Sequence, residues 1–291
     1  MAKSKAEKEA IKQKYNHDDL PKIKNIFIYP YFCFMKLFCY AFFGVGAVIL
    51  AVLVFPFFHI FIHDKKKFGI TARSYVSHTF RFFINMMRVT GVIRLKNDDL
   101  EAMKNLRGKV IIANHPSILD FVFIMSFVPT ATCIVRGSLL KTPVGGVIRQ
   151  AYITNTTDFD EMCARCKELL ELGCNVIIFP EGTRSPRHGR NSYKKGAARI
   201  ALKTGANVQP VFIGGSDKYC LGKHDPWWSY NHVERLLYHF QLLSEIDVSQ
   251  YKDLSEPIAA KHLTEKMEEV IRGAGDAYSQ NHPLCKTLNT Y

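Results

Sequence analysis

Residues 110–127 read Val-Ile-Ile-Ala-Asn-His-Pro-Ser-Ile-Leu-Asp-Phe-Val-Phe-Ile-Met-Ser-Phe. The first four residues are apolar and mostly β-branched, which predicts a short buried strand. Residues 117–127 form an apolar run of a length that suits a helix. The stretch therefore predicts a strand that turns directly into a helix, the repeating unit of α/β folds.

The same alternation continues toward the C-terminus. Strands are predicted at 132–135, 152–153, 176–179, 208–213 and within 233–246, and helices over 138–150, 158–172, 194–203 and 257–277. The helix over 138–150 contains Pro143 and Gly145 and is expected to break there. This order predicts an α/β domain over residues 96–291, with a central, mostly parallel sheet flanked by helices.

The N-terminal third has a different composition. From Leu37 to Ile62 the chain contains no Asp, Glu, Lys or Arg, and this length exceeds the roughly 20 residues that a helix needs to cross a bilayer. We expect residues 26–95 to form a membrane-associated helical anchor. Pro56 interrupts the run and lysines flank both ends, so a single pass and a hairpin that returns to the same face both remain open.

One basic segment lies within this region and another precedes it. Residues 73–88 have the pattern of an amphipathic helix, either at the membrane interface or buried against the following domain. Residues 1–25 form a lysine-rich arm, which we expect to contact anionic lipid headgroups.

The charge balance points to an anionic partner. The chain has 39 Lys and Arg against 26 Asp and Glu, a net charge of +13, which suits nucleic acid, a membrane surface or a phosphate-bearing substrate. Nucleic acid is disfavoured because no helix-turn-helix, zinc-finger or RNP-like pattern occurs. Cys163 and Cys166 form a CxxC without a second ligand pair, so we expect two thiols one turn apart on a helix and no metal.

The first motif with chemical meaning is Asn114-His115-Pro116-Ser117-Ile118-Leu119-Asp120. We expect His115 at the corner between strand and helix, where catalytic residues of α/β folds gather. Asp120 is then placed to accept a hydrogen bond from the imidazole, which makes His115 a candidate general base. His59 and Asp64 have the same spacing, but no strand and no Asn precede them, so we interpret that pair as chance.

The second motif is Phe179-Pro180-Glu181-Gly182-Thr183-Arg184-Ser185, also at the end of a predicted strand. Gly182 lets the backbone turn close to a ligand, and Arg184 can bind phosphate through two hydrogen bonds. Glu181 can accept a hydrogen bond from a substrate hydroxyl or hold Arg184 in place. A surface turn with an internal ion pair would explain the second motif alone, but not both motifs together.

These two motifs resemble those of the glycerolipid acyltransferase family, which includes the 1-acylglycerol-3-phosphate acyltransferases. The resemblance covers residues 110–213 and implies a His115–Asp120 catalytic dyad, an acceptor site and an acyl site lined by residues 208–211. The residues assigned to substrate binding are Asn114, Arg136, Lys141, Glu181, Gly182, Thr183 and Arg184. The stretch 133–143 is similar to a bacterial subgroup associated with specialised lipids. A basic residue common in the family is missing near Asn155, for which Arg136, Lys141 and Arg149 are candidates to compensate.

The resemblance implies transfer of a fatty acyl group from acyl-CoA or acyl-acyl-carrier protein to a lysophosphatidate-like lipid, without a cofactor. The expected location is the bacterial cytoplasmic (inner) membrane, with the catalytic domain on its cytoplasmic face. Two alternatives stay open: a specialised lipid acceptor without glycerophosphate, and a non-catalytic basic scaffold on the membrane. The basic residues Arg187, Arg190, Lys194, Lys195 and Arg199 form a candidate docking patch for an acidic carrier protein. The sequence predicts no oligomeric state.

Overall fold

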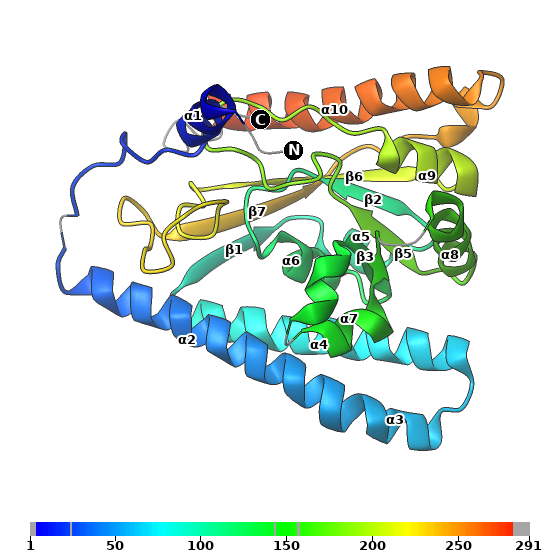
Figure 1. Cartoon of the computed structure of the whole chain (residues 1–291), viewed down its shortest axis with the longest axis horizontal. Helices are drawn as coiled ribbons and strands as arrows, with labels where there is room; N and C mark the ends of the chain where they lie inside the picture. The colour runs from blue at the N-terminus through cyan, green and yellow to red at the C-terminus, as the bar shows by residue number, and fades with distance from the viewer. Residues whose placement is uncertain (1–3, 24, 143, 156–157, 282–291) are drawn as a thin grey trace.

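A single seven-stranded sheet organises the molecule (Figure 1). The computed structural model describes residues 4–23, 25–142, 144–155 and 158–281. The strands are β1 (Ile93–Asn97), β2 (Val110–Ala113), β3 (Ala131–Val135), β4 (Ile153–Thr154), β5 (Asn175–Ile178), β6 (Val208–Gly215) and β7 (Leu236–Leu242). Their order across the sheet is β1-β7-β6-β2-β5-β3-β4. Every neighbouring pair is parallel except β6 and β7, so the prediction of a mostly parallel sheet is confirmed.

Strand β2 lies at the centre, between β5 and β6. Ile111 is in register with Ile177 of β5 and Gln209 of β6, and all four residues of β2 are buried. A strand covered on both faces needs apolar side chains at successive positions, which is the pattern of residues 110–113. The carboxyl ends of β2 and β5 therefore lie side by side, and both motifs begin there.

Helices cover both faces of the sheet. The helices α8 (Phe159–Glu171), α9 (Gly196–Thr204) and α10 (Glu256–Asn281) share one core with one face. On the other face lie α4 (Lys65–Val89), α6 (Asp120–Phe127) and α7 (Gly145–Ala151), with the short α5 (Leu100–Lys104) nearby. In Figure 1, α10 runs above the sheet and α4 below it.

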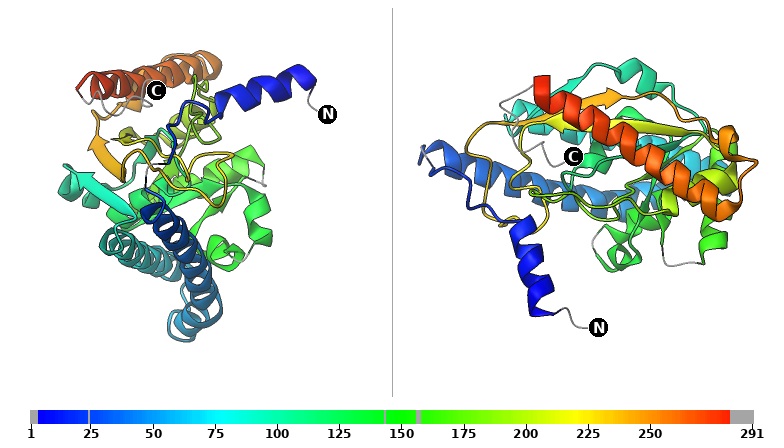
Figure 2. Two further views of the ribbon diagram at one scale, coloured as in Figure 1. Left: turned by 90° about the vertical axis from the view of Figure 1, so that its left-hand side faces the viewer. Right: turned by 90° about the horizontal axis from the view of Figure 1, so that it is seen from above.

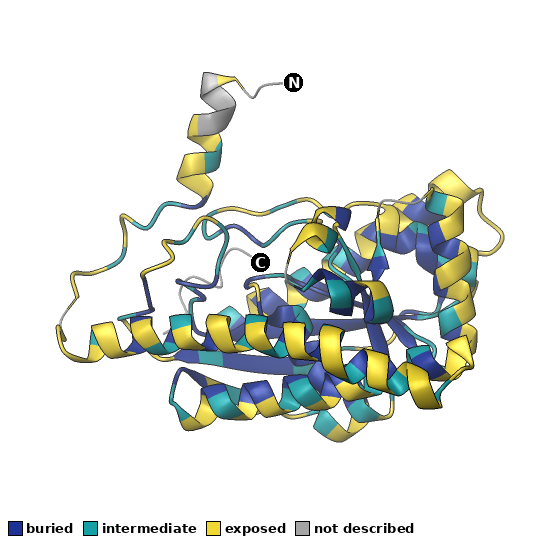
Figure 3. Cartoon of the chain, turned by 60° about the horizontal axis from the view of Figure 1, so that its bottom comes forward, coloured by how far each residue is buried: buried dark blue, intermediate teal, exposed yellow. Residues whose placement is uncertain are grey.

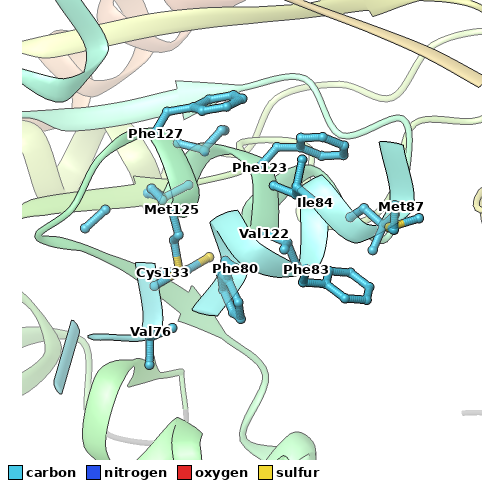
Figure 4. Packing of buried hydrophobic residues seen from close by; sticks show 14 of the residues in the cluster. Val76, Phe80, Phe83, Ile84, Met87, Val122, Phe123, Met125, Phe127 and Cys133 are labelled. Atoms are coloured by element: carbon cyan, nitrogen blue, oxygen red, sulfur yellow. The ribbon is translucent and has the colours of Figure 1, made fainter. Parts of the chain in front are cut away.

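The packing of α4 on α6 ties the N-terminal region to the α/β body (Figure 4). Phe80, Phe83 and Met87 of α4 are buried together with Val122 and Phe123 of α6. Full burial of each large apolar side chain contributes about 1.5–3 kcal/mol, so this contact holds the helix firmly. Helix α4 is thus a layer of the body, which is the second of the two roles predicted for residues 73–88.

The apolar N-terminal segment forms the outer arm of a helical hairpin. It runs through α2 (Ile28–Ile49), a π-helical turn (Leu50–Val54) and α3 (Phe55–Phe61), and the chain then reverses into α4. The rod from Ile28 to Phe61 is long and apolar enough to cross a membrane by length and composition. Most of its outward residues are exposed, including Phe34, Val45 and Leu53 (Figure 3).

One contact ties the hairpin to the rest of the body, and another ties its two arms to each other. Near the turn, Lys66 forms an ion pair of 3.3 Å with Glu168 of α8. At the open end, the Tyr31 hydroxyl donates to the carbonyl of Thr90 over 3.2 Å. The hairpin therefore lies along the body instead of extending away from it.

Several element bounds differ from the predictions. Helix α6 begins at Asp120 and not at Ser117, because residues 114–119 form a loop. The helix predicted over 138–150 is a 3-10 turn (Gly137–Lys141) followed by α7; Pro143 lies outside the described residues. Strand β1 was not predicted, and the expected domain boundary at residue 96 falls inside it. Its sequence Ile-Arg-Leu-Lys-Asn alternates with polar residues because it is an edge strand, paired only with β7.

Candidate active site

The loop after β2 brings His115 and Asp120 into contact. His115 Nδ1 lies 2.8 Å from Asp120 Oδ2. The Asp120 carboxylate is fully buried and also accepts hydrogen bonds from the backbone NH and the hydroxyl of Ser117, at 2.8 and 2.5 Å. Since a carboxylate accepts, Nδ1 is the donor in this pair and Nε2 is left unprotonated in the neutral ring. That tautomer is the one a general base requires.

The imidazole of His115 has a firm support on one side. Its ring stacks on Phe179, with centroids 4.1 Å apart and planes inclined by 20°. The side chain keeps 18% of its surface exposed. Phe179 precedes the second motif, so the two motifs meet through this stack.

Glu181 fastens the two motifs together at the backbone. Its Oε1 accepts hydrogen bonds from the NH of His115 at 3.2 Å and from the hydroxyl of Ser185 at 2.5 Å. Its Oε2 accepts from Asn191 Nδ2 at 2.8 Å. Burial raises the pKa of Glu181, while the hydrogen bonds from Ser185, Asn191 and His115 act in the opposite direction. Glu181 thus positions His115, and the partners of its carboxylate within the described residues are His115, Ser185 and Asn191 and not Arg184.

The rest of the second motif lies at the edge of a large cavity. Gly182 has a φ of +67°, a conformation that favours glycine, and its carbonyl accepts a hydrogen bond from Arg136 Nη2 at 3.1 Å. Arg184 Nη1 donates to the carbonyls of Leu221 and Gly222 at 3.1 and 2.5 Å, which fixes the guanidinium. Thr183 also lines the cavity.

The cavity has a volume of about 820 Å³ and lies between the hairpin and the body. His115 lines it together with four cationic side chains, Arg136, Arg184, Lys194 and Lys223. The remainder of the lining is mostly apolar and comes largely from α2, α4, α7 and β3. One compartment therefore combines a candidate base, positive charge and room for an apolar chain.

Besides Glu181, two more predicted binding residues lie outside the cavity lining. Asn114 is buried, and its side-chain amide exchanges two hydrogen bonds with the backbone of Ile213, at 2.9 and 2.8 Å. It joins β2 to β6 and so holds the loop that carries His115. Lys141 is exposed at the end of the 3-10 turn and is not part of the cavity lining. Arg149, suggested as a substitute cation, is also outside the lining, whereas Asn155 is within it.

The prediction that residues 208–211 line an acyl site does not agree with the structure. These residues belong to β6, which is buried between β2 and β7, and none of them lines the cavity. A central strand is covered on both faces, so it has no free surface for a lipid chain. The apolar walls come instead from the helices that pack over the sheet.

The basic patch predicted as a carrier-protein surface is largely neutralised within the chain. Arg187 pairs with Asp19 and Asp217, at 2.8 and 3.0 Å. Arg190 pairs with Asp276, and Arg199 with Glu256. Lys194 lines the cavity. Three of the five residues thus have acidic partners within the chain and a fourth lines the cavity, while Lys195 is exposed.

The basic N-terminal arm has a role that its composition did not indicate. Its helix α1 (Lys5–Lys14) projects from the body (Figure 2). The end of α1 and the residue after it contact the second motif and the segment that follows it. The Tyr15 hydroxyl donates to the carbonyl of Arg184 over 3.2 Å, and the NH of His188 donates to the carbonyl of Lys14 at 2.9 Å. Lys3 and Lys24 lie outside the described residues. Tyr15 was missed because only tertiary contact distinguishes it from other residues of the arm.

The chain is similar to known proteins in both sequence and fold. A family model described as Acyltransferase matches residues 93–214. The chloroplastic 1-acyl-sn-glycerol-3-phosphate acyltransferase of Brassica napus is 28% identical over 188 residues, which cover 60% of this chain and 52% of the relative. That of Arabidopsis thaliana is 30% identical over 185 residues, covering 60% and 50%. The chain spans about half the length of these two relatives.

The fold comparison agrees. The crystal structure of the 1-acyl-sn-glycerophosphate acyltransferase of Thermotoga maritima matches with a TM-score of 0.61 and 25% identity, over 83% of this chain and 96% of that one. Motifs, family model and fold agree on the region around residues 93–214, which matches the model of the acyltransferase family. The proteins that the chain resembles there are 1-acylglycerol-3-phosphate acyltransferases.

Proposed function

We propose that the protein is a membrane-associated O-acyltransferase with a lysophosphatidate-like acceptor and acyl-CoA or acyl-acyl-carrier protein as donor. The observation that carries this proposal is the position of His115, paired with Asp120, in the wall of a cavity that is cationic in one part and apolar in most of the rest. An acceptor with a phosphate and a fatty chain has the same two chemical parts.

His115 and Asp120 act as the base and its orienting acid. Nε2 of His115 removes the proton from the acceptor hydroxyl, and the oxygen attacks the thioester carbonyl. The tetrahedral intermediate collapses, the carbon–sulfur bond breaks, and the thiolate leaves with the proton that His115 returns. Asp120 stabilises the imidazolium in between, as a carboxylate does in hydrolytic triads.

The oxyanion of the intermediate needs a positive partner. The NH groups of His115, Ser117 and Gly182 are candidates by position, but each already donates within the protein: to Glu181, to Asp120 and to the carbonyl of Phe179. Ile118 NH likewise donates to the carbonyl of Leu221. The cationic side chains in the cavity wall are therefore the candidates for stabilising this charge.

The same cations suit an anionic headgroup. Arg136, Arg184, Lys194 and Lys223 come from four separate segments and line one cavity. Arg is well matched to phosphate through its planar fork of donors. The missing basic residue near Asn155 keeps a specialised acceptor as the second candidate.

The hairpin supports a monotopic attachment to the membrane. Its apolar outer face is exposed, while α4 is held to the body by its packing on α6 and by the Lys66–Glu168 ion pair, and the Tyr31–Thr90 contact joins the two arms. A hairpin held in this way lies along a bilayer surface with its apolar side in the lipid. We propose that this surface is the bacterial inner membrane and that the body lies on the cytoplasmic side, where the thioester donors occur.

Release of free thiol from a thioester donor tests the proposal. Full-length protein in mixed micelles with palmitoyl-CoA should release thiol only when lysophosphatidate or the true acceptor is added, and the acylated lipid should appear in equal amount. His115→Ala should lower both by roughly 10²- to 10⁴-fold. Thiol release with hydroxyl-bearing lipids that lack glycerophosphate, but not with lysophosphatidate, would select the specialised acceptor, and no release with any donor and acceptor pair would favour a scaffold.

A further inference from the structure

The loop between β6 and β7 exposes an aromatic surface that the catalytic chemistry does not use. It contains both tryptophans of the chain, Trp227 and Trp228. Trp227 is 72% exposed and Trp228 is 44% exposed, and their rings contact each other at 6.1 Å. Two adjacent tryptophans on a surface expose a large apolar area to water, which is unfavourable. We therefore expect a partner to cover them.

This loop is packed against the first turns of the apolar helix α2. Tyr230 stacks on Phe32 with ring centroids 4.6 Å apart, and His232 contacts Tyr29 at 5.9 Å. His232 Nε2 also lies 2.6 Å from the carbonyl oxygen of Pro21. The tryptophan loop therefore lies beside the end of the hairpin from which the exposed apolar face starts.

The apolar surface at this end has a basic border. Phe27 and Val233 are exposed, and so are Arg94 and Arg235. Burial raises the pKa of Tyr230 and both arginines oppose that rise, so the two guanidiniums lie close to the same ring. Arg235 lies over the ring of Phe32, 5.9 Å from its centroid, and no ion pair of either arginine is found among the described residues. Exposed aromatic rings bordered by unneutralised cations are complementary to the headgroup region of an anionic bilayer.

We propose that Trp227 and Trp228 form a second membrane contact, which seats at headgroup depth beside the hairpin and uses Arg94 and Arg235 to select anionic lipids. The inference rests on the membrane association proposed above and adds a site outside the hairpin. Tryptophan is the side chain that prefers this depth, because its ring is apolar and its NH still reaches water or a headgroup oxygen. The second contact fixes the orientation of the body on the membrane. With the hairpin as the only contact, the whole molecule could rotate about the hairpin axis relative to the bilayer.

The chain supplies its own probe, because its tryptophans occur only in this loop. Full-length protein is mixed with vesicles of phosphatidylcholine containing phosphatidylglycerol, and tryptophan emission is recorded with and without brominated lipids. We expect emission to move to shorter wavelength on binding. Lipids brominated near the headgroup should quench more strongly than lipids brominated near the chain end.

A reporter on the far side of the molecule is the matched control. Leu254 is 43% exposed, similar to Trp228, and precedes α10 on the opposite face of the sheet. The triple variant Trp227→Phe, Trp228→Phe, Leu254→Trp should float with the vesicles, with neither shift nor quenching. Replacing Arg94 and Arg235 by Gln should reduce affinity for anionic vesicles by roughly fivefold per arginine, whereas Lys252→Gln should not.

The outcomes separate this inference from the proposed function. Flotation with unchanged emission of the native tryptophans would overturn the second contact and leave the hairpin attachment and the acyltransferase activity standing. Emission that shifts only on addition of acyl carrier protein would show a protein partner and contradict the lipid assignment. The thiol-release assay is independent of the fluorescence. Absence of thiol release would overturn the proposed acyltransferase activity and would leave the membrane contact of the tryptophans standing.

Discussion

His115 and Asp120 are five residues apart, and so are His59 and Asp64. In the first pair the imidazole hydrogen-bonds the carboxylate at 2.8 Å. In the second, His59 lies in the last turn of α3 and stacks on Phe68, while Asp64 caps α4 by accepting from the NH of Lys67 at 2.7 Å. The spacing is the same, but one carboxylate orients an imidazole and the other begins a helix.

The difference comes from what surrounds each pair. The loop from β2 curls so that Asp120, Ser117 and Tyr238 form a buried hydrogen-bonded chain beneath His115. The segment between His59 and Asp64 ends one helix and starts the next, so the two side chains serve separate helices. A pair of this spacing becomes a catalytic candidate only when the intervening backbone folds back on itself.

The largest expected effect comes from removing the base. His115→Ala should lower acyl transfer by roughly 10²- to 10⁴-fold, because proton removal from the acceptor is lost. His59→Ala is the matched control and should leave turnover near that of the native protein. Initial rates of thiol release from palmitoyl-CoA measure both. Equal losses in the two variants would contradict the assignment of His115.

Asp120→Asn should lower turnover by about 100-fold, since a charge-assisted hydrogen bond contributes about 3 kcal/mol to the imidazolium. Asp64→Asn should change neither rate nor stability appreciably, because Asn caps a helix as well as Asp does. Steady-state rates and thermal unfolding distinguish the two effects. A full rate in Asp120→Asn would show that the carboxylate is only structural.

Glu181→Gln should lower kcat by about tenfold with little change in KM for either substrate, since the loss of one charged acceptor costs about 1.5 kcal/mol. The expected loss comes from positioning. Both carboxylate oxygens of Glu181 accept hydrogen bonds, from His115 NH, Ser185 and Asn191, whereas the glutamine amide has only one acceptor oxygen. A rise in KM for the acceptor, with kcat unchanged, would instead show that Glu181 binds the lipid.

The smallest expected effect concerns the aromatic supports. Phe179→Leu should lower turnover by roughly 2- to 10-fold, because an aromatic stack is worth about 0.5–1.5 kcal/mol. Phe68→Leu removes the equivalent stack under His59. It should shift the unfolding temperature and leave the rate intact. Parallel measurement of rate and unfolding in the two variants gives the comparison.

Several features of the molecule could be predicted from local sequence. The β-branched run 110–113, the turn signals after it and the repeated alternation with helices led to the mostly parallel sheet. The two motifs at strand ends led to the site, because the carboxyl ends of adjacent parallel strands lie together. The edge strand β1 was missed because its alternation with Arg94 and Lys96 gave no continuous apolar signal.

The partners of individual side chains could not be predicted in this way. Asn114 and Glu181 were expected to bind substrate, but both satisfy backbone groups of neighbouring segments. Arg187, Arg190 and Arg199 were expected to form a surface patch, but acidic residues from other parts of the chain pair with them. Composition records the charge of a segment and not the charge of what packs against it.

By itself, the sequence determined most of the alternation of strands and helices after residue 110, the long apolar segment, and the two motifs at strand ends, because these depend on periodicity and composition. Only the tertiary structure decided that the hairpin walls the cavity, that Glu181 holds His115, and that Tyr15 reaches Arg184 across 169 positions of sequence. The physical reason is that such contacts form when the whole chain closes around its core. No local pattern encodes which distant segment will arrive there.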